Sequence, residues 1–177
     1  MLEKKELRKE MLGRRDTLAP TQKQKYDTAI CEQILDIITI HNYNIIHTYL
    51  PMGSEINIFP LIERLLTTGK TVVTPKALKQ RKMENLILNS LNELESGIYG
   101  TQHPANSIEY TGNFDLFIIP GLAFDRQNYR LGYGSGYYDT FLVSQPQAYK
   151  LGIAYPFQII EKVPTEPHDM VLDQILY

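Results

Sequence analysis

Three short apolar runs, each closed by a proline, restrict the fold of this 177-residue chain more than any other feature. They occupy residues 44–50, 70–74 and 114–119. Short runs rich in β-branched and aromatic residues, bounded by turn signals, predict buried strands. Residues 60–66, between the first two runs, have helical spacing of their apolar side chains and end before Gly69. Strand, helix and strand with short connections are typical of a right-handed parallel crossover.

The rest of the chain continues this alternation. We expect helices over residues 2–14, from the N-cap Thr21 to Ile38 and from 136 to 142, strands over 84–88 and 149–154, and irregular structure over 89–113. The sequence thus predicts an α/β fold in a single domain, residues 1–177: a three-layer sandwich with a mostly parallel central sheet flanked by helices. Because ligands of such sheets bind outside the carboxyl ends of the strands, the loop that follows Ile119 is a candidate site.

Composition narrows the class of protein. Hydrophobic residues make up 43% and charged residues 21% of the chain, as in globular domains, and a formal net charge of -2 argues against a general nucleic-acid-binding protein. Cys31 is the only cysteine, which excludes an intramolecular disulfide and a multi-cysteine zinc site. The N-terminus is highly charged without an apolar core, and no apolar run reaches the length of a membrane span. We therefore expect a cytoplasmic protein that acts on small molecules, with no nucleic-acid, membrane or obligate protein partner.

The run Arg130–Asp139, RLGYGSGYYD, is either a tight glycine turn covered by tyrosines or a loop that binds phosphate. It fits neither standard template: Tyr137 replaces the third glycine of the dinucleotide fingerprint, and the P-loop motif is absent. The chemistry still favours phosphate. Glycines let backbone N–H groups approach an anion, arginine offers a planar fork of donors, and a helix starting near Gly136 points its N-terminus at the same place. Asp139 is then placed to ligate the Mg²⁺ that accompanies a nucleotide.

The N-terminal helix also admits two interpretations. Lys4 and Arg8 are four residues apart and share a helix face. They belong either to an ordinary solvated face or to a second contact with phosphate. Charge on a helix face is common, so the residues alone favour the first interpretation.

The glycine-rich loop carries a family resemblance as well. Residues 120–139, PGLAFDRQNYRLGYGSGYYD, resemble the signature of the 5-formyltetrahydrofolate cyclo-ligases, also called 5,10-methenyltetrahydrofolate synthetases. Three further segments are similar to motifs of that family: KKELR at 4–8, YLPMGSE at 49–55 and HDMVLD at 168–173. They follow in order and span nearly all of the chain.

The resemblance implies an ATP-dependent ligase. It implies that 5-formyltetrahydrofolate is cyclised to 5,10-methenyltetrahydrofolate through a phosphorylated formyl (imidate) intermediate, with ATP as co-substrate, Mg²⁺ as cofactor, and ADP and phosphate released. It implies catalytic roles for Arg130 and Tyr137, and Mg²⁺ ligation by Asp139 and Asp169. The implied folate-binding residues are Leu50, Glu55 and Tyr137, and the implied ATP-binding residues are Lys4, Lys5, Arg8, Arg130, Leu131, Gly132, Tyr133, Gly134, Ser135, Gly136, Tyr137 and Tyr138.

Two other classes of protein are weighed against this one. The first is an α/β enzyme of the sugar-phosphate isomerase and CoA-transferase type, which needs neither ATP nor Mg²⁺. The second is a non-catalytic folate- or nucleotide-binding module, against which the full set of charged site residues argues. His103 stands where many members of the family have glutamate, so no role is assigned to it. His47 and Cys31 are expected to be packing residues.

Overall fold

The computed structural model describes residues 2–166 and 169–177. Its main sheet has six strands, and every neighbouring pair except β2–β3 is parallel. The strand order is β11 (Gln174–Leu176), β9 (Tyr149–Ile153), β6 (Leu116–Ile119), β1 (Ile45–Thr48), β2 (Thr71–Ala77) and β3 (Met83–Ile87). The prediction of a mostly parallel central sheet is confirmed.

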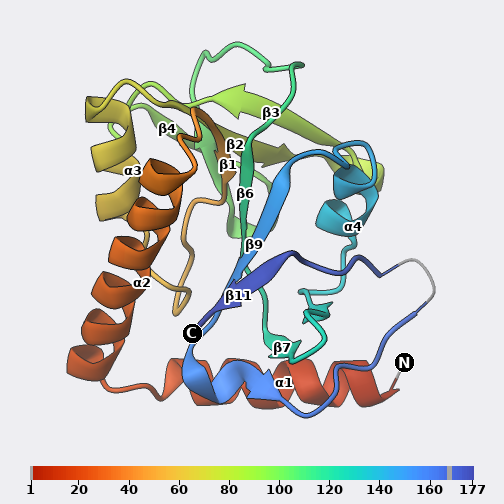
Figure 1. Ribbon diagram of the computed structural model, residues 1–177. Helices are drawn as coiled ribbons and strands as arrows, with labels where there is room; N and C mark the ends of the chain where they lie inside the picture. The colour runs from red at the N-terminus through yellow and green to blue at the C-terminus, as the bar shows by residue number, and fades with distance from the viewer. Residues whose placement is uncertain (1, 167–168) are drawn as a thin grey trace.

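Helices cover both faces of this sheet. α2 (Pro20–Ile40) and α3 (Phe59–Thr67) lie on one face, α4 (Tyr137–Leu142) lies on the other, and α1 (Leu2–Asp16) runs along the bottom of the view in Figure 1. These are the three layers predicted. Within the described residues, no helix is long and apolar enough to cross a membrane.

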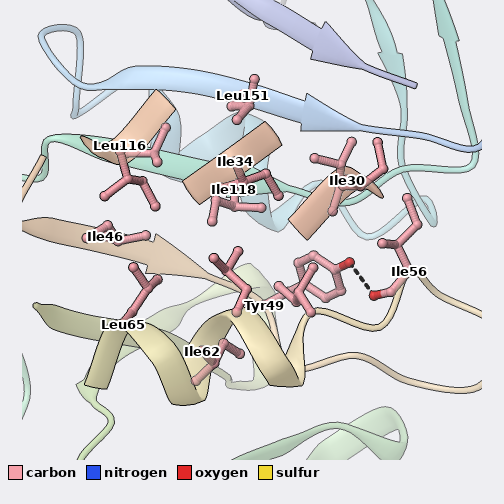
Figure 2. Close-up of a cluster of buried hydrophobic side chains, with 14 of the residues drawn as sticks. Ile30, Ile34, Ile46, Tyr49, Ile56, Ile62, Leu65, Leu116, Ile118 and Leu151 are labelled. Atoms are coloured by element: carbon pink, nitrogen blue, oxygen red, sulfur yellow. Dashed lines mark hydrogen bonds between the residues drawn. The ribbon is translucent and has the colours of Figure 1, made fainter. Parts of the chain in front are cut away.

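Alternate residues of the strands point to opposite faces of the sheet and pack in two separate hydrophobic cores. Leu116 and Ile118 of β6 pack in the cluster that includes α2 and α3, whereas Phe117 and Ile119 belong to the cluster on the α4 side. Figure 2 shows the first cluster, where the Tyr49 hydroxyl donates to the Ile56 carbonyl at 2.8 Å. A slip of one residue would exchange the two faces, so burial fixes the register of the sheet.

His47 lies in the second core. It is fully buried, its ring centroid is 4.9 Å from that of Phe117, and its Nε2 is 3.0 Å from Asn85 Oδ1. Burial lowers the pKa of His47 to about 3, and the Asn85 contact opposes the shift only in part. His47 is therefore a neutral core residue at ordinary pH, as its sequence context predicts.

A smaller sheet joins α1 to the glycine-rich loop. Its strand order is β10 (Ile159–Ile160), β7 (Ala123–Asp125) and β8 (Arg130–Leu131). Met11 of α1 packs in one cluster with Leu131. Leu131, the second residue of the glycine-rich loop, is thus held against the N-terminal helix.

β2 runs through Pro75, whereas the sequence predicts a strand that stops before it. The Leu88 N–H donates to the Val72 carbonyl at 2.8 Å, so by alternation the backbone of Pro75 faces β1 rather than β3. β1 pairs with β2 no further than Val73. The missing N–H of proline therefore removes no hydrogen bond from the sheet.

Two other predicted boundaries are wrong. α2 begins at Pro20 with Ala19 at the N-cap, because proline fits the first helical turn, and Thr21 already lies inside the helix. Residues 89–113 are not irregular throughout. They contain an antiparallel hairpin of β4 (Leu94–Ser96) and β5 (Gln102–Pro104), which a tight turn at Ile98–Gly100 connects.

Candidate active site

A cavity of about 360 Å³ lies at the carboxyl ends of the parallel strands. Leu50 and Glu55 after β1, Ala77 at the end of β2 and Pro120 directly after β6 are among its lining residues. The strand order reverses at β1, since β2 lies on one side of it and β6 on the other. Switch points of this kind are where open α/β sheets bind their ligands.

Residues 130–136 form the wall of the cavity that contacts α1. Arg8 Nε donates to the Gly132 carbonyl at 2.9 Å. Gly134 has φ of +106°, and a Cβ added there would lie 3.2 Å from Arg8 Cζ. Glycine is therefore required at residue 134 both for its backbone conformation and for the close approach of Arg8. α4 begins after the loop as predicted, but with six residues it is too short to support the anion site expected at its N-terminus.

Arg130 is fixed beside the cavity with its charge already paired. It is 8% exposed, and its Nη2 lies 2.9 Å from Asp139 Oδ1. Its guanidinium carbon is 5.5 Å from the centroid of the Tyr138 ring, and Nη1 donates to the Pro120 carbonyl at 3.4 Å. Among the described residues, Arg130 Nε has no hydrogen-bond partner although it is buried. The side chain thus has a fixed position and one unused donor.

Lys4 of α1 also lines the cavity, and it is a second cation whose charge is paired. Its Nζ lies 2.9 Å from Asp169 Oδ2 and 3.1 Å from Glu166 Oε2. Burial lowers the pKa of Lys4, but the hydrogen bonds and charges of the two carboxylates outweigh burial, so the net shift is upward. Lys4 is therefore charged at neutral pH. Pro167 and His168 of this segment lie outside the described residues.

Glu55 is a buried carboxylate that also lines the cavity. Oε2 accepts the Met52 N–H at 2.9 Å, and Oε1 accepts the Tyr133 hydroxyl. Burial raises the pKa of Glu55, while these two hydrogen bonds and the Arg15 charge counteract part of the increase. Arg15 lies over the Tyr133 ring at 5.6 Å and donates to Ser54 Oγ at 3.0 Å. The glycine-rich loop, α1 and the segment carrying Glu55 are thus joined through Tyr133.

Two tyrosines follow the glycines in the wall of the cavity. The Tyr137 hydroxyl donates to the Leu78 carbonyl, and burial and the neighbouring Tyr99 both raise the pKa of Tyr137. In the described part of the chain, the buried Tyr138 hydroxyl has no hydrogen-bond partner, and burial raises the pKa of Tyr138. Both hydroxyls are protonated at neutral pH, so they can act as hydrogen-bond donors and not as bases.

The acidic residues of the cavity suit a metal ion that binds together with a ligand, which supplies part of its coordination. Asp139 and Asp169 both line it, each paired with a cation. The described residues do not gather three or more His, Cys, Asp or Glu side chains into a metal site. One or two carboxylates, completed by phosphate oxygens and water, are the usual environment of Mg²⁺ bound with a nucleotide.

The cavity brings together nearly all residues predicted for the site. Lys5 is the exception: it is exposed and absent from the lining. His103 is buried in the β4–β5 hairpin, 3.4 Å from Glu95, and does not line the cavity either. The sequence analysis missed a group of uncharged lining residues, because they form no local motif. They are Pro75, Ala77, Met83, Tyr99, Thr101 and Gln102.

Comparison with known proteins decides which family this site represents. The model of the 5-formyltetrahydrofolate cyclo-ligase family matches residues 1–177. The chain belongs to this family. It is therefore an enzyme, a ligase of folate metabolism, and the isomerase and transferase class is set aside.

A bacterial and an animal relative resemble this chain over almost their whole length. The 5-formyltetrahydrofolate cyclo-ligase of Mycoplasma genitalium is 31% identical over 179 residues, which cover 99% of this chain and 98% of the relative. The mouse enzyme of the same name is 27% identical over 191 residues, covering 98% and 93%.

Two solved structures share the fold. The NMR structure of Aquifex aeolicus 5,10-methenyltetrahydrofolate synthetase matches with a TM-score of 0.85 at 28% identity and covers 99% of this chain and 89% of that chain. The Mycoplasma pneumoniae synthetase matches with a TM-score of 0.77 at 28% identity, covering 97% and 96%.

Proposed function

We propose that this cyclo-ligase converts 5-formyltetrahydrofolate to 5,10-methenyltetrahydrofolate in the cavity described above, with ATP as co-substrate and Mg²⁺ as cofactor. The observation that carries the proposal is the asymmetry of this one cavity. A cationic, glycine-rich wall contains Lys4, Arg8 and Arg130, and another wall contains the buried carboxylate of Glu55. Such a space suits two ligands at once: a triphosphate, which binds to positive charges, and a pterin ring, whose N–H groups donate to a carboxylate.

The cationic wall is the proposed ATP site. Lys4, Arg8 and Arg130 supply three positive charges, and glycines 132, 134 and 136 expose backbone N–H groups. The carboxylates of Asp139 and Asp169 now hold two of these cations in place. When bound, Mg²⁺ would neutralise phosphate charge, and Asp139 and Asp169 are the residues that would hold it.

The part of the cavity around Glu55 is the proposed folate site. The Glu55 carboxylate accepts hydrogen bonds, and the amino-pyrimidinone edge of a pterin offers N–H donors. Leu50, 7% exposed, adds apolar surface beside it. We assign contacts with both ligands to Tyr137, because it lines the cavity at the end of the glycine-rich loop.

Activation of the formyl oxygen is the chemical problem that this arrangement addresses. The N5-formyl oxygen attacks the γ-phosphorus of ATP and ADP leaves, which gives a phosphorylated imidate. N10 then adds to the same carbon, the carbon–oxygen bond breaks, N10 loses its proton, and phosphate departs with the former formyl oxygen. Arg130 stabilises the charge on the transferred phosphoryl group. The Tyr137 hydroxyl exchanges its hydrogen bond to the Leu78 carbonyl for one to an oxygen of the reacting groups. The protein otherwise contributes by alignment of the two ligands.

The proposal is tested by mixing the protein with 5-formyltetrahydrofolate, ATP and Mg²⁺ and following the near-ultraviolet absorbance of the methenyl product. Product should form only when ATP is present. Arg130→Ala and Asp139→Ala should impair ATP use far more than folate binding, while Arg126→Ala, an exposed arginine outside the cavity, serves as control. Absence of ATP-dependent product refutes the proposal. Binding of both ligands without product would identify a non-catalytic module instead.

A further inference from the structure

Tyr99 is an exposed aromatic residue at the cavity, and the mechanism above does not use it. It is 73% exposed and lines the cavity. Its φ is +57°, in the left-handed region that bulky residues rarely adopt. A residue held in such a conformation persists only when its surroundings enforce it, and such residues gather at functional sites.

The turn around Tyr99 enforces this conformation. The Gly97 N–H donates to the Thr101 carbonyl at 2.8 Å, and the Thr101 N–H and hydroxyl donate to the Ile98 carbonyl at 3.1 and 2.7 Å. A Cβ at Gly97 would lie only 2.6 Å from Thr101 Oγ1. The β4–β5 hairpin thus closes tightly beneath Tyr99 and presents its ring at the mouth of the cavity.

The surroundings of Tyr99 suit an aromatic ligand and not a phosphate. The lining residues contributed by β2, β3 and the β4–β5 hairpin are uncharged: Ala77, Met83, Thr101 and Gln102. The Tyr99 side chain also interacts with the Tyr137 hydroxyl, which belongs to the residue proposed to contact folate. The cations of the cavity lie on α1 and the glycine-rich loop instead.

We infer that Tyr99 is a further folate-binding residue, whose ring stacks on the pterin or p-aminobenzoyl ring of 5-formyltetrahydrofolate and closes its side of the cavity. This inference rests on the proposed function and adds a residue to its folate site. Flat aromatic ligands gain from contact with an aromatic face beyond the area that they bury. That gain explains why a strained, exposed tyrosine stands at this point of the hairpin.

The test separates the ring, its hydroxyl and the backbone conformation. The dissociation constant of 5-formyltetrahydrofolate is measured by calorimetry without ATP, together with the melting temperature and the dissociation constant of a non-hydrolysable ATP analogue with Mg²⁺. Tyr99→Phe keeps the ring, whereas Tyr99→Asn removes it and tolerates the left-handed conformation. Tyr177→Asn removes an exposed tyrosine outside the cavity and is the matched control.

Tyr99→Asn should weaken folate binding by about 3- to 10-fold, leave the affinity for the ATP analogue within twofold, and maintain or raise the melting temperature. Tyr99→Phe and Tyr177→Asn should bind folate within about twofold of the unmodified protein. Unchanged folate affinity in Tyr99→Asn overturns the inference. So does equal weakening in Tyr99→Phe, loss of affinity only together with lower stability, or loss confined to the ATP analogue. If the unmodified protein forms no ATP-dependent product, the proposed function itself has failed, which is a separate result.

Discussion

The buried histidine of β1 makes folding stability depend on pH in a way that the structure quantifies. The pKa of His47 is about 3 in the folded protein, compared with 6.5 for an unperturbed histidine. Between these values the unfolded chain binds a proton that the folded protein does not, so stability falls as pH falls below 6.5. At pH 5 the difference amounts to 1.5 pH units, or about 2 kcal/mol of unfolding free energy lost relative to pH 8. Well above pH 6.5 the His47 contribution no longer changes with pH.

The measurement is urea unfolding at pH 8 and pH 5 for the unmodified protein and for His47→Leu. Replacing His47 leaves Asn85 Oδ1 without its 3.0 Å contact, which destabilises the folded variant. That loss does not depend on pH and cancels when the two conditions are compared. His47→Leu should therefore lose about 2 kcal/mol less stability than the unmodified protein on going from pH 8 to pH 5. His41→Gln, a change at an exposed histidine, should behave like the unmodified protein. Equal acid sensitivity in His47→Leu would refute the reasoning.

Two further predictions concern the walls of the cavity. Gly134→Ala should raise the KM for ATP at least about 10-fold in steady-state kinetics, because the Cβ would be strained at φ +106° and 3.2 Å from Arg8 Cζ. Gly13→Ala on α1 meets nothing within 4 Å and should instead stabilise the protein by roughly 0.5–1 kcal/mol, so similar ATP kinetics in the two variants would count against the packing argument. Glu55→Gln should raise the KM for 5-formyltetrahydrofolate by about 10-fold or more, because a hydrogen bond to a charged acceptor contributes about 1.5–3 kcal/mol, and should leave the KM for ATP nearly unchanged. If Glu55→Gln changed the KM for ATP alone, the assignment of Glu55 to the folate site would be wrong.

The parallel sheet was predictable because its signals are local. Apolar runs ending at proline mark β1 and β6 closely, and the glycine-rich loop stands in one continuous stretch of sequence. Pro75 shows where local signals fail. Whether proline stops a strand depends on which neighbour its backbone faces and on whether that neighbour is still paired there. For Pro75 the first is set by the pairing of β2 with β3, and the second by the end of the β1–β2 pairing at His47 and Val73.

The site was predictable in its charged part and not in its uncharged part. Lys4, Arg8 and Arg130 stand in short motifs, but Tyr99 lies in a segment without periodicity and is brought to the cavity only by the β4–β5 hairpin. The contact between Tyr133 and Glu55 joins residues separated by 78 positions. Such a contact follows from the order of strands in the sheet, which the local pattern does not contain.

The central claim is that the formyl oxygen is activated by phosphoryl transfer from ATP in this cavity. It is tested most directly with 5-formyltetrahydrofolate labelled with ¹⁸O in the formyl group, incubated with the protein, ATP and Mg²⁺. The account predicts that inorganic phosphate released with the methenyl product carries one ¹⁸O atom per molecule. Phosphate without the label, formed in equal amount with the product, would contradict the account.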